Sequence, residues 1–278
     1  MKIAITAEST IDLPKDLLDK YDIKIIPYQV MLGETEYIDG EITAEDIFDY
    51  VQKNKVLPKT SAINEEQYKA FFEESKQGYD ALVHFCLSSK ISSACSHAQA
   101  AAEKLNNVYV VDSLSLSTGI ALEAIKARKL AEEGVEAKDI YEILTKLTPK
   151  VQASFVVERL DYLHKGGRCS AIALFGANLL KLRPQIILKD GFMKPARKYR
   201  GKMEKVIEEY CADVLKEHAN PDLSVGFVTY TSATPEMAQA AKEALKARGF
   251  ETIYETHAGA TITSHCGEHT LGILFMDK

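Results

Sequence analysis

The sequence predicts an α/β protein with two domains. The N-terminal domain is expected to be a three-layer α/β/α unit with a parallel sheet, and the C-terminal domain an α/β unit with a mixed sheet. Strand and helix patterns alternate through the first half, whereas in the second half the hairpin signal Asp190-Gly191 separates two apolar runs. The length of 278 residues suits one large or two ordinary domains. We expect the boundary near Pro149, with domains at 1–149 and 150–278.

In the N-terminal domain, short apolar strands alternate with helices. The strands are expected at 2–6, 23–30, 81–87 and 108–112, and the helices at 15–21, 44–53, 64–75, 92–105, 117–133 and 137–147. Thr43 is placed to cap the second of these helices. Pro27 interrupts the second strand, which favours an edge or an end of the sheet. Helices of this length between strands imply right-handed crossovers and a parallel sheet covered on both faces.

In the C-terminal domain, strands and helices follow a different order. The strands are expected at 151–157, 184–189, 193–199, 224–230, 253–256 and 271–276. The helices are expected at 170–182, 203–218 and 235–248, after a short helix that ends at Lys165. Because the hairpin strands are antiparallel, the second sheet must be mixed.

Composition and charge exclude several classes of function. Hydrophobic residues make up 46% and charged residues 27% of the chain, as in a globular protein, and no apolar run is long enough to span a bilayer. The net charge of -6 argues against nucleic-acid binding, and the basic run around Arg197, Arg200 and Lys202 offers no stacking aromatic beyond Tyr199. The first residues resemble a strand and no signal peptide, and the five cysteines form no CxxC pair, so we expect a cytoplasmic protein.

Standard catalytic and cofactor motifs are missing from the sequence. We find no GxGxxG, no phosphate-binding GxxxxGK followed by Ser or Thr, and no GxSxG. In the segment from His265 to His269, two histidines four residues apart would need a helix to bind a metal together, yet Gly267 lies between them and a strand pattern follows. We therefore expect no metal site and no cofactor.

Hydroxyl side chains follow several strands of the predicted parallel sheet, where such sheets bind ligands. These clusters are Glu8-Ser9-Thr10, Thr60-Ser61, Ser88-Ser89, Ser92-Ser93 and Asp112-Ser113. Each hydroxyl taken singly is better explained as a helix cap. Together they predict a site that accepts an anion by hydrogen bonding, without a strong base to activate a nucleophile.

The segment Leu163-His164-Lys165-Gly166-Gly167-Arg168 precedes a basic run over 194–205. The double glycine is expected to end a helix with a left-handed turn, which aims Arg168 outward. An exposed arginine can bind a carboxylate or a phosphate with two parallel hydrogen bonds. The alternative is a capped helix followed by a solvated basic hairpin.

Several motifs together resemble the DegV family over essentially the whole chain. They are Pro58-Lys59-Thr60-Ser61, Leu87-Ser88-Ser89-Lys90-Ile91-Ser92-Ser93, Val111-Asp112-Ser113, the segment from Leu160 to Arg168, Tyr199-Arg200-Gly201-Lys202 and Ser264-His265-Cys266-Gly267. The resemblance implies a two-layer C-terminal domain and a bacterial fatty-acid carrier of the FakB type. Such carriers hold a long-chain fatty acid between the domains and present its carboxylate to a fatty-acid kinase, which forms acyl phosphate.

The resemblance also implies roles for individual residues. Thr60, Ser92 and His265 would contact the carboxylate, and Arg168 and Arg200 would face the kinase and its nucleotide phosphates. The ligand would be the fatty acid alone, without a cofactor, and the partners would be the kinase and, transiently, a membrane surface. An acyl tunnel would be lined by some of Leu174, Phe175, Leu179, Leu180, Ile186 and Ile187, although ordinary core packing explains most of these.

The chain departs from the family pattern at Ser92-Ser93-Ala94, at Thr60-Ser61-Ala62-Ile63-Asn64 and at Gly267-Glu268-His269. Glu268 would either repel a carboxylate or fix the tautomer of His265. The alternative function is a stand-alone hydrolase or phosphotransferase that uses Ser92 or Ser113 as nucleophile and His265 as base. We favour the carrier, because only Glu268 is available to orient that histidine.

Overall fold

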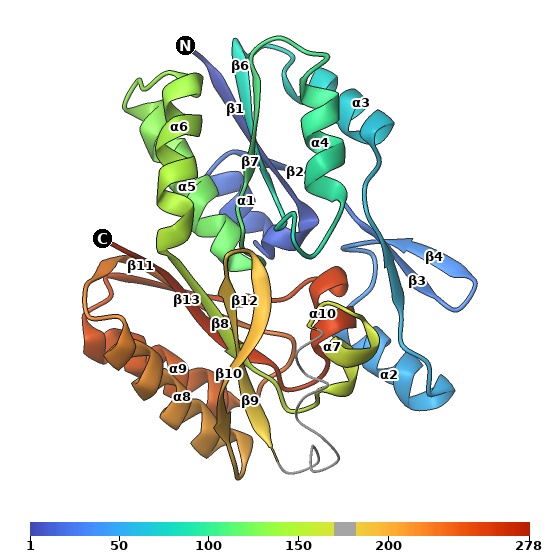
Figure 1. The fold of residues 1–278 in the computed structure, drawn as a ribbon, viewed down its shortest axis with the longest axis vertical. Helices are drawn as coiled ribbons and strands as arrows, with labels where there is room; N and C mark the ends of the chain where they lie inside the picture. The colour runs from blue at the N-terminus through green and yellow to red at the C-terminus, as the bar shows by residue number, and fades with distance from the viewer. Residues whose placement is uncertain (170–181) are drawn as a thin grey trace.

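The computed structural model of the chain describes residues 1–169 and 182–278 (Figure 1). Its strands form a parallel sheet in the order β2-β1-β6-β7, a small sheet in the order β4-β3-β5, and a mixed sheet in the order β10-β9-β8-β13-β11-β12. The predicted helix over 170–182 lies, apart from its last residue, outside the described residues. The α/β class with one parallel and one mixed sheet is confirmed.

The parallel sheet lies between two layers of helices. Its strands are β1 (Ile3–Glu8), β2 (Ile23–Ile26), β6 (Ala81–Cys86) and β7 (Val108–Asp112), and every residue of β1 and β6 is buried. One face is covered by α5 (Thr118–Glu132) and α6 (Ala137–Leu147), and the other by α3 (Glu65–Ser75) and α4 (Ala94–Ala102), as Figure 1 shows. The short α1 (Lys15–Lys20) packs beside β2. This is the predicted three-layer arrangement.

Capping side chains fix two helix starts in this half. Thr43 accepts the backbone N–H of Asp46 at the start of α2 (Ala44–Asn54), and the Asp46 carboxylate accepts the backbone N–H of Thr43 in return. Asn64 and Gln67 form the same reciprocal pair at the start of α3. The cap predicted at Thr43 is therefore confirmed.

The single strand predicted over 23–30 is wrong. Strand β2 ends at Ile26, at an edge of the parallel sheet, and β3 (Gln29–Leu32) belongs to the small antiparallel sheet with β4 (Thr35–Ile38) and β5 (Lys59–Ser61). Pro27 has no N–H to donate to a strand ladder, so the chain leaves one sheet there and enters another. This small sheet carries Thr60, which pairs with Val30.

The mixed sheet occupies the second half of the chain. Its strands are β8 (Val151–Val156), β9 (Arg183–Lys189), β10 (Phe192–Tyr199), β11 (Pro221–Tyr230), β12 (Thr252–His257) and β13 (Leu271–Asp277), and only the pair β11–β12 is parallel. Asp190 and Gly191 between β9 and β10 both have positive φ, 55° and 80°, as a tight hairpin turn requires. The predicted hairpin is confirmed.

Helices α8 (Met203–Glu217) and α9 (Pro235–Arg248) cover one face of the mixed sheet and bury a core of their own against it. Helix α5 of the first half packs against β8, β11 and β13, so one helix contacts both sheets. Thr118 of this helix is hydrogen-bonded to Thr229 of β11 through their hydroxyls, 2.6 Å apart. The largest hydrophobic cluster accordingly runs through both halves. The boundary at 149/150, next to the 3-10 turn η2 (Thr148–Lys150), stays a prediction.

Two short helices carry residues of interest between these sheets. Helix α7 (Asp161–Lys165) precedes the glycine pair and was expected, whereas α10 (Ala260–Cys266) was not. The start of α10 is held by two carboxylates: Asp12, just past the turn η1 (Ser9–Ile11), accepts the N–H of Gly259 (2.8 Å), and Asp39 accepts the N–H of Ala260 (2.7 Å). Because backbone N–H groups at a helix start lack partners within the helix, these side chains fix its position.

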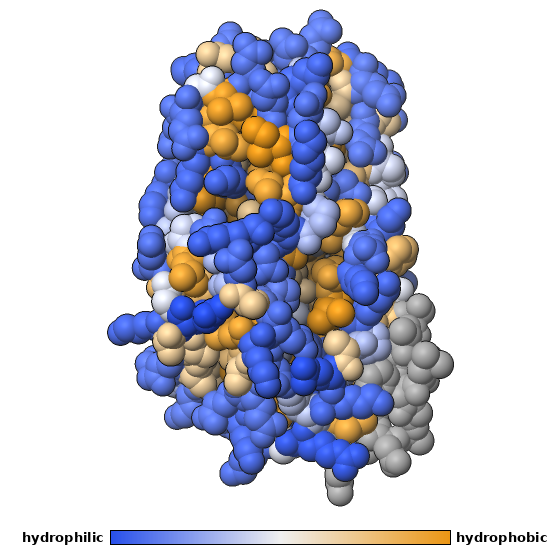
Figure 2. Space-filling model, turned by 60° about the vertical axis from the view of Figure 1, so that its left-hand side comes forward, coloured by the Kyte–Doolittle hydropathy of each residue, from blue (hydrophilic) through white to orange (hydrophobic). Residues whose placement is uncertain are grey.

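The surface in Figure 2 is mainly hydrophilic, with smaller apolar patches between the hydrophilic residues. Among the described helices, none combines the length and the apolar character needed to cross a bilayer.

Candidate functional site

A small cavity lies where β5, the loop after β6, α10 and the segment after α7 meet. Its volume is about 90 Å³, which is room for several waters. The lining residues are Tyr28, Thr60, Ala62, Leu87, Ile91, Ser92, Ser93, Leu116, Arg168, Met193, Thr261, Ile262, His265 and Cys266. The structure thus brings together Thr60, Ser92 and His265, three side chains far apart in the sequence, in one cavity.

Thr60 and His265 contact each other directly. The Thr60 hydroxyl lies 2.8 Å from Nε2 of His265, and either atom can be the donor, depending on the imidazole tautomer. Burial, helped by the positive charge of Arg168, lowers the pKa of His265 to about 4. The imidazole is therefore neutral near neutral pH and carries one N–H donor.

The other ring nitrogen of His265 faces the glycine pair. Nδ1 is buried and has no hydrogen-bond partner within the described part of the chain. A Cβ added to Gly166 would lie only 2.7 Å from this atom, so the absence of a side chain at Gly166 lets the imidazole pack against the backbone. Gly166 itself has a helical φ of -68°, whereas Gly167 adopts the left-handed φ of +71°. The predicted left-handed turn is therefore formed by Gly167 alone, whereas Gly166 allows the His265 imidazole to approach the backbone closely.

Arg168 lies at the mouth of the cavity. It lines both the cavity and a wider outer hollow that also contains Lys90, Ser93 and Phe192. Its guanidinium donates to the carbonyl oxygen of Gly166 (2.6 Å), and the side chain is half-buried. Arg168 thus reaches outward, as expected, but also forms part of the cavity wall.

Ser92 has two hydrogen-bonding roles. Its Oγ accepts the backbone N–H of Ala94 (3.2 Å) at the start of α4, and it lies 3.1 Å from the hydroxyl of Tyr28. Ser92 therefore lies one residue before the N-cap of α4, which is Ser93, and its hydroxyl lines the cavity; its contact with a ligand stays a prediction. Tyr28 was not singled out in the sequence, since it follows Pro27 and lies in no motif.

Behind Ser92 lies the fully buried carboxyl group of Glu8. It accepts hydrogen bonds from the hydroxyls of Tyr68, Thr10 (3.2 Å) and Tyr28 (3.3 Å) and from the N–H of Leu87 (2.8 Å). Burial outweighs these bonds and raises the pKa of Glu8 to about 7. Glu8 was expected at the rim of the sheet as part of a hydroxyl cluster, but the structure places it inside the core.

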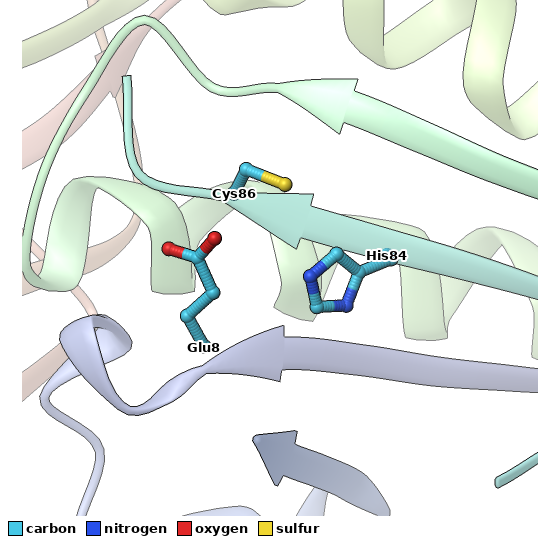
Figure 3. Close-up of side chains that lie close together, drawn as sticks. All are labelled: Glu8, His84 and Cys86. Atoms are coloured by element: carbon cyan, nitrogen blue, oxygen red, sulfur yellow. The ribbon is translucent and has the colours of Figure 1, made fainter. Parts of the chain in front are cut away.

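Glu8, His84 and Cys86 point toward one another from β1 and β6 (Figure 3), with possible ligand atoms within 4.8 Å. These are side chains of the kind that bind metals. However, Glu8 is occupied by the donors named above, and burial raises the pKa of the Cys86 thiol well above its usual value. Nδ1 of His84 lies 2.9 Å from the Thr6 hydroxyl, so among the described residues this group is a hydrogen-bonded part of the core.

Other predicted residues lie elsewhere. Ser113 is fully buried and its hydroxyl donates to the carbonyl oxygen of Cys86 (2.6 Å), so it is no exposed nucleophile. Arg200 is exposed just beyond β10. Of the suggested tunnel residues, Ile186 is fully buried and Ile187 half-buried, and the remaining four lie outside the described residues.

Of the two effects considered for Glu268 in the atypical last loop, the structure bears on the one that concerns the tautomer of His265. Glu268 lines a separate outer hollow with Arg159, Tyr162 and Lys165. Because Nδ1 of His265 lacks a partner among the described residues and Nε2 bonds to Thr60, Glu268 does not fix the tautomer of His265.

Chemically, the cavity offers hydroxyl donors and one neutral imidazole, with an arginine at its mouth. The Ser92 hydroxyl bonds to Tyr28 and to a backbone N–H, and the His265 imidazole bonds to Thr60, so the described hydrogen bonds of the cavity do not join a serine hydroxyl to a histidine ring. This arrangement suits the binding of an anion.

Comparison with known proteins assigns the chain to a protein family. The family model described as "Uncharacterised protein, DegV family" matches residues 2–278. The chain belongs to the DegV family. Among curated relatives, it is 32% identical over 284 residues to a fatty acid-binding protein of Thermotoga maritima, with 98% of this chain and 96% of that protein covered.

Solved structures of DegV proteins share the fold over the full length. A Thermus thermophilus DegV family protein, described by its fatty acid binding, superposes with a TM-score of 0.92 at 28% identity, with all of both chains covered. DegV of Bacillus subtilis, described as a fatty acid binding protein, gives a TM-score of 0.87 at 30% identity, again with 100% of both chains covered. The recognition made from the sequence motifs is confirmed.

Proposed function

We propose that this DegV protein is a carrier for a long-chain fatty acid, whose carboxylate binds to Thr60, Ser92 and His265. The observation that carries the proposal is the convergence of these three side chains, from β5, the loop before α4, and α10, on one cavity. Relatives at 28% to 32% identity over the full length are described as fatty-acid-binding proteins, which supports the choice of ligand.

The cavity has the donors that a buried carboxylate needs. A carboxylate removed from water must be hydrogen-bonded or it becomes protonated. The Ser92 hydroxyl and the Thr60–His265 pair supply neutral donors: when Nε2–H of His265 donates to Thr60, the Thr60 hydroxyl keeps its proton for the carboxylate. Arg168 at the mouth adds a positive charge without being fully buried. The head group is therefore stabilised while its charge stays close to the opening.

The acyl chain would extend from the cavity toward the mixed sheet. A second, almost entirely apolar cavity of about 30 Å³ shares Leu116, Ile262 and Cys266 with the first and is lined further by residues such as Phe155 and Leu274. Because both cavities are small, the proposed tunnel between domains 1–149 and 150–278 must widen when the ligand enters. Burial of about fourteen methylenes at ~0.8 kcal/mol each provides roughly 11 kcal/mol before entropy losses.

The carrier would act with a fatty-acid kinase and would not be an enzyme itself. In this step, a carboxylate oxygen attacks the γ-phosphorus of ATP, the bond to the β-γ bridging oxygen breaks, and acyl phosphate and ADP form; the kinase supplies nucleotide and metal. Arg168 and Arg200 would face the kinase, and the outer hollow that contains Lys90 and Arg168 would lie at the contact. The carrier would work in the cytoplasm, with a transient membrane contact for lipid exchange.

A matched pair of arginine variants tests this division of roles. We expect Arg200→Ala to leave fatty-acid affinity unchanged and to reduce acyl-phosphate formation with the kinase about ten-fold, because Arg200 is exposed outside the cavity. Arg168→Ala should weaken affinity by only a few fold, since it lines the mouth, and reduce acyl-phosphate formation much more.

The two readouts are the dissociation constant by calorimetry and labelled acyl phosphate from a reconstituted kinase reaction. Equal losses of affinity and of phosphorylation in Arg168→Ala would contradict a role at the kinase contact. Turnover of acyl esters or phosphates by the carrier alone would support the enzyme alternative.

A further inference from the structure

A chain of hydroxyl groups joins the buried Glu8 to the proposed carboxylate site. The Tyr28 hydroxyl donates to Oε2 of Glu8 over 3.3 Å and lies 3.1 Å from Oγ of Ser92. Ser92 and Tyr28 both line the cavity, whereas Glu8 is fully buried behind them. Glu8 is therefore two hydrogen bonds away from the Ser92 hydroxyl that would bind the ligand.

The direction of these bonds depends on the proton of Glu8, because each hydroxyl has a single proton to donate. When Glu8 is ionised, Tyr28 donates to it, and Ser92 must then be the donor in the Tyr28–Ser92 bond. The Ser92 proton is consequently used in the bond to Tyr28 and is not free to bind a ligand. When Glu8 is protonated, it can donate to Tyr28, Tyr28 can donate to Ser92, and the Ser92 proton is free to bind a carboxylate.

We propose that Glu8 is a positioning residue that acts through Tyr28 to orient the Ser92 hydroxyl, so that fatty-acid carboxylate binding is coupled to proton uptake at Glu8. The inference rests on the proposed function, because it concerns the same head-group site.

Four ionisable groups around Glu8, namely Tyr28, Tyr68, His84 and Cys86, have pKa values that burial moves away from neutral pH. The ionisable side chains facing it are Tyr28 before β3, Tyr68 on α3, and His84 and Cys86 on β6, with Cys95 of α4 behind Cys86. Burial lowers the pKa of His84 to about 3 and raises the pKa values of Tyr28, Tyr68 and Cys86 well above their usual range. Of these and Glu8, only Glu8, with a pKa of about 7, changes charge near neutral pH.

Electrostatics acts in the same direction as the hydroxyl chain. An ionised Glu8 and a fatty-acid carboxylate are like charges in a poorly solvated region, so each disfavours the other. Ligand binding and protonation of Glu8 therefore reinforce each other, and by linkage the affinity must fall as pH rises through the pKa of Glu8.

The test is the affinity of the full chain for palmitate, measured by calorimetry between about pH 6 and about pH 8.5. We expect the wild-type affinity to fall about ten-fold over this range. Glu8→Gln removes the titrating group, so this variant should bind palmitate with little pH dependence. Tyr28→Phe removes the connecting hydroxyl and should keep only the smaller part of the pH dependence that comes from charge repulsion between Glu8 and the ligand. Titration of palmitate itself is common to all variants and cancels in the comparison.

Tyr68→Phe is the matched control, because Tyr68 also donates to Glu8 but does not contact Ser92 in the described hydrogen bonds. It should keep the pH dependence, with its midpoint at higher pH, since loss of a donor disfavours the carboxylate form. A wild-type affinity independent of pH, or a wild-type slope retained in Tyr28→Phe, would overturn the coupling while leaving the carrier function intact. Failure of the wild type and of all three variants to bind palmitate would instead contradict the proposed function.

Discussion

Glu8 and Asp12 are two buried carboxyl groups four residues apart. Glu8 is the last residue of β1 and Asp12 follows the next turn, and the two groups support the cavity in different ways. Three of the donors to Glu8 are hydroxyls, and one of these, Tyr28, leads to Ser92. Asp12 instead accepts the Ser117 hydroxyl (2.5 Å) and the backbone N–H of Gly259 (2.8 Å), at the start of α10. Burial raises the pKa of both groups.

The difference shows that residues at the end of one strand can both adjust a site and fix its position. A hydroxyl can rotate and exchange the roles of donor and acceptor, so the partners of Glu8 can respond to its protonation. A backbone N–H at a helix start is fixed in direction, so Asp12 determines the position of α10 and, with it, of His265. We therefore assign adjustment of the site to Glu8 and rigid placement of the site to Asp12.

The largest expected effect concerns the pH dependence of stability. The pKa of Glu8 rises from 4.5 to about 7 on folding, so the protonated form favours the folded state. This contribution of about 3 kcal/mol is complete below pH 4.5 and is lost as pH rises to about 7. The unfolding free energy of the wild type relative to Glu8→Gln should decline over this window and stay level above it. Urea unfolding at a series of pH values measures this difference in unfolding free energy. A difference that does not vary with pH would show that Glu8 does not contribute to the pH dependence of stability.

Removal of the Asp12 carboxyl group should lower the free energy of unfolding nearly as much, but its local effect should be on helix α10. We expect Asp12→Ala to lower the unfolding free energy by about 2 kcal/mol, because the N–H of Gly259 and the Ser117 hydroxyl lose a buried partner. Asp16→Ala, which changes an exposed carboxylate on α1, is the control. Hydrogen exchange should show faster opening of α10. Unchanged protection of its amides would contradict the assignment of α10 placement to Asp12.

A smaller effect is expected at the glycine that packs against His265. Gly166→Ala places a Cβ 2.7 Å from Nδ1 of His265 and 2.9 Å from the carbonyl oxygen of Tyr162, so the imidazole must move. We expect a loss of fatty-acid affinity of roughly ten-fold, with a stability loss of about 1 kcal/mol. Gly167→Asn is the matched control, because its left-handed backbone tolerates asparagine and a Cβ there meets nothing within 4 Å. Equal affinity of the two variants would show that the position of the imidazole is not critical.

The fold was largely predictable because its strands and helices are long enough to show their periodicity. The Asp190-Gly191 hairpin and the Thr43 cap follow from local rules and appear as expected. The sheet of β3, β4 and β5 escaped prediction because its strands are short and because β5 pairs with a distant segment, Thr60 with Val30. Helix α10 escaped because its start is fixed by Asp12 and Asp39, more than two hundred residues earlier.

The site was predictable only in part. The family motifs singled out Thr60, Ser92 and His265, and the structure brings them to one cavity. Tyr28 and the burial of Glu8 depend on contacts between distant segments, such as the 64 residues that separate Tyr28 from Ser92, which no local pattern encodes. The polar side chains that follow the buried strands were a second signal: Ser92 lines the cavity, whereas Glu8 lies in the core behind it.

The most direct test of the central claim is native mass spectrometry of the purified chain, with organic extraction of whatever is bound. The account predicts an added mass equal to one long-chain fatty acid per chain, or its appearance after incubation with palmitate, and its weakening in a variant that carries Thr60→Val and Ser92→Ala together. A chain that is purified without lipid and does not bind added fatty acids would contradict the account.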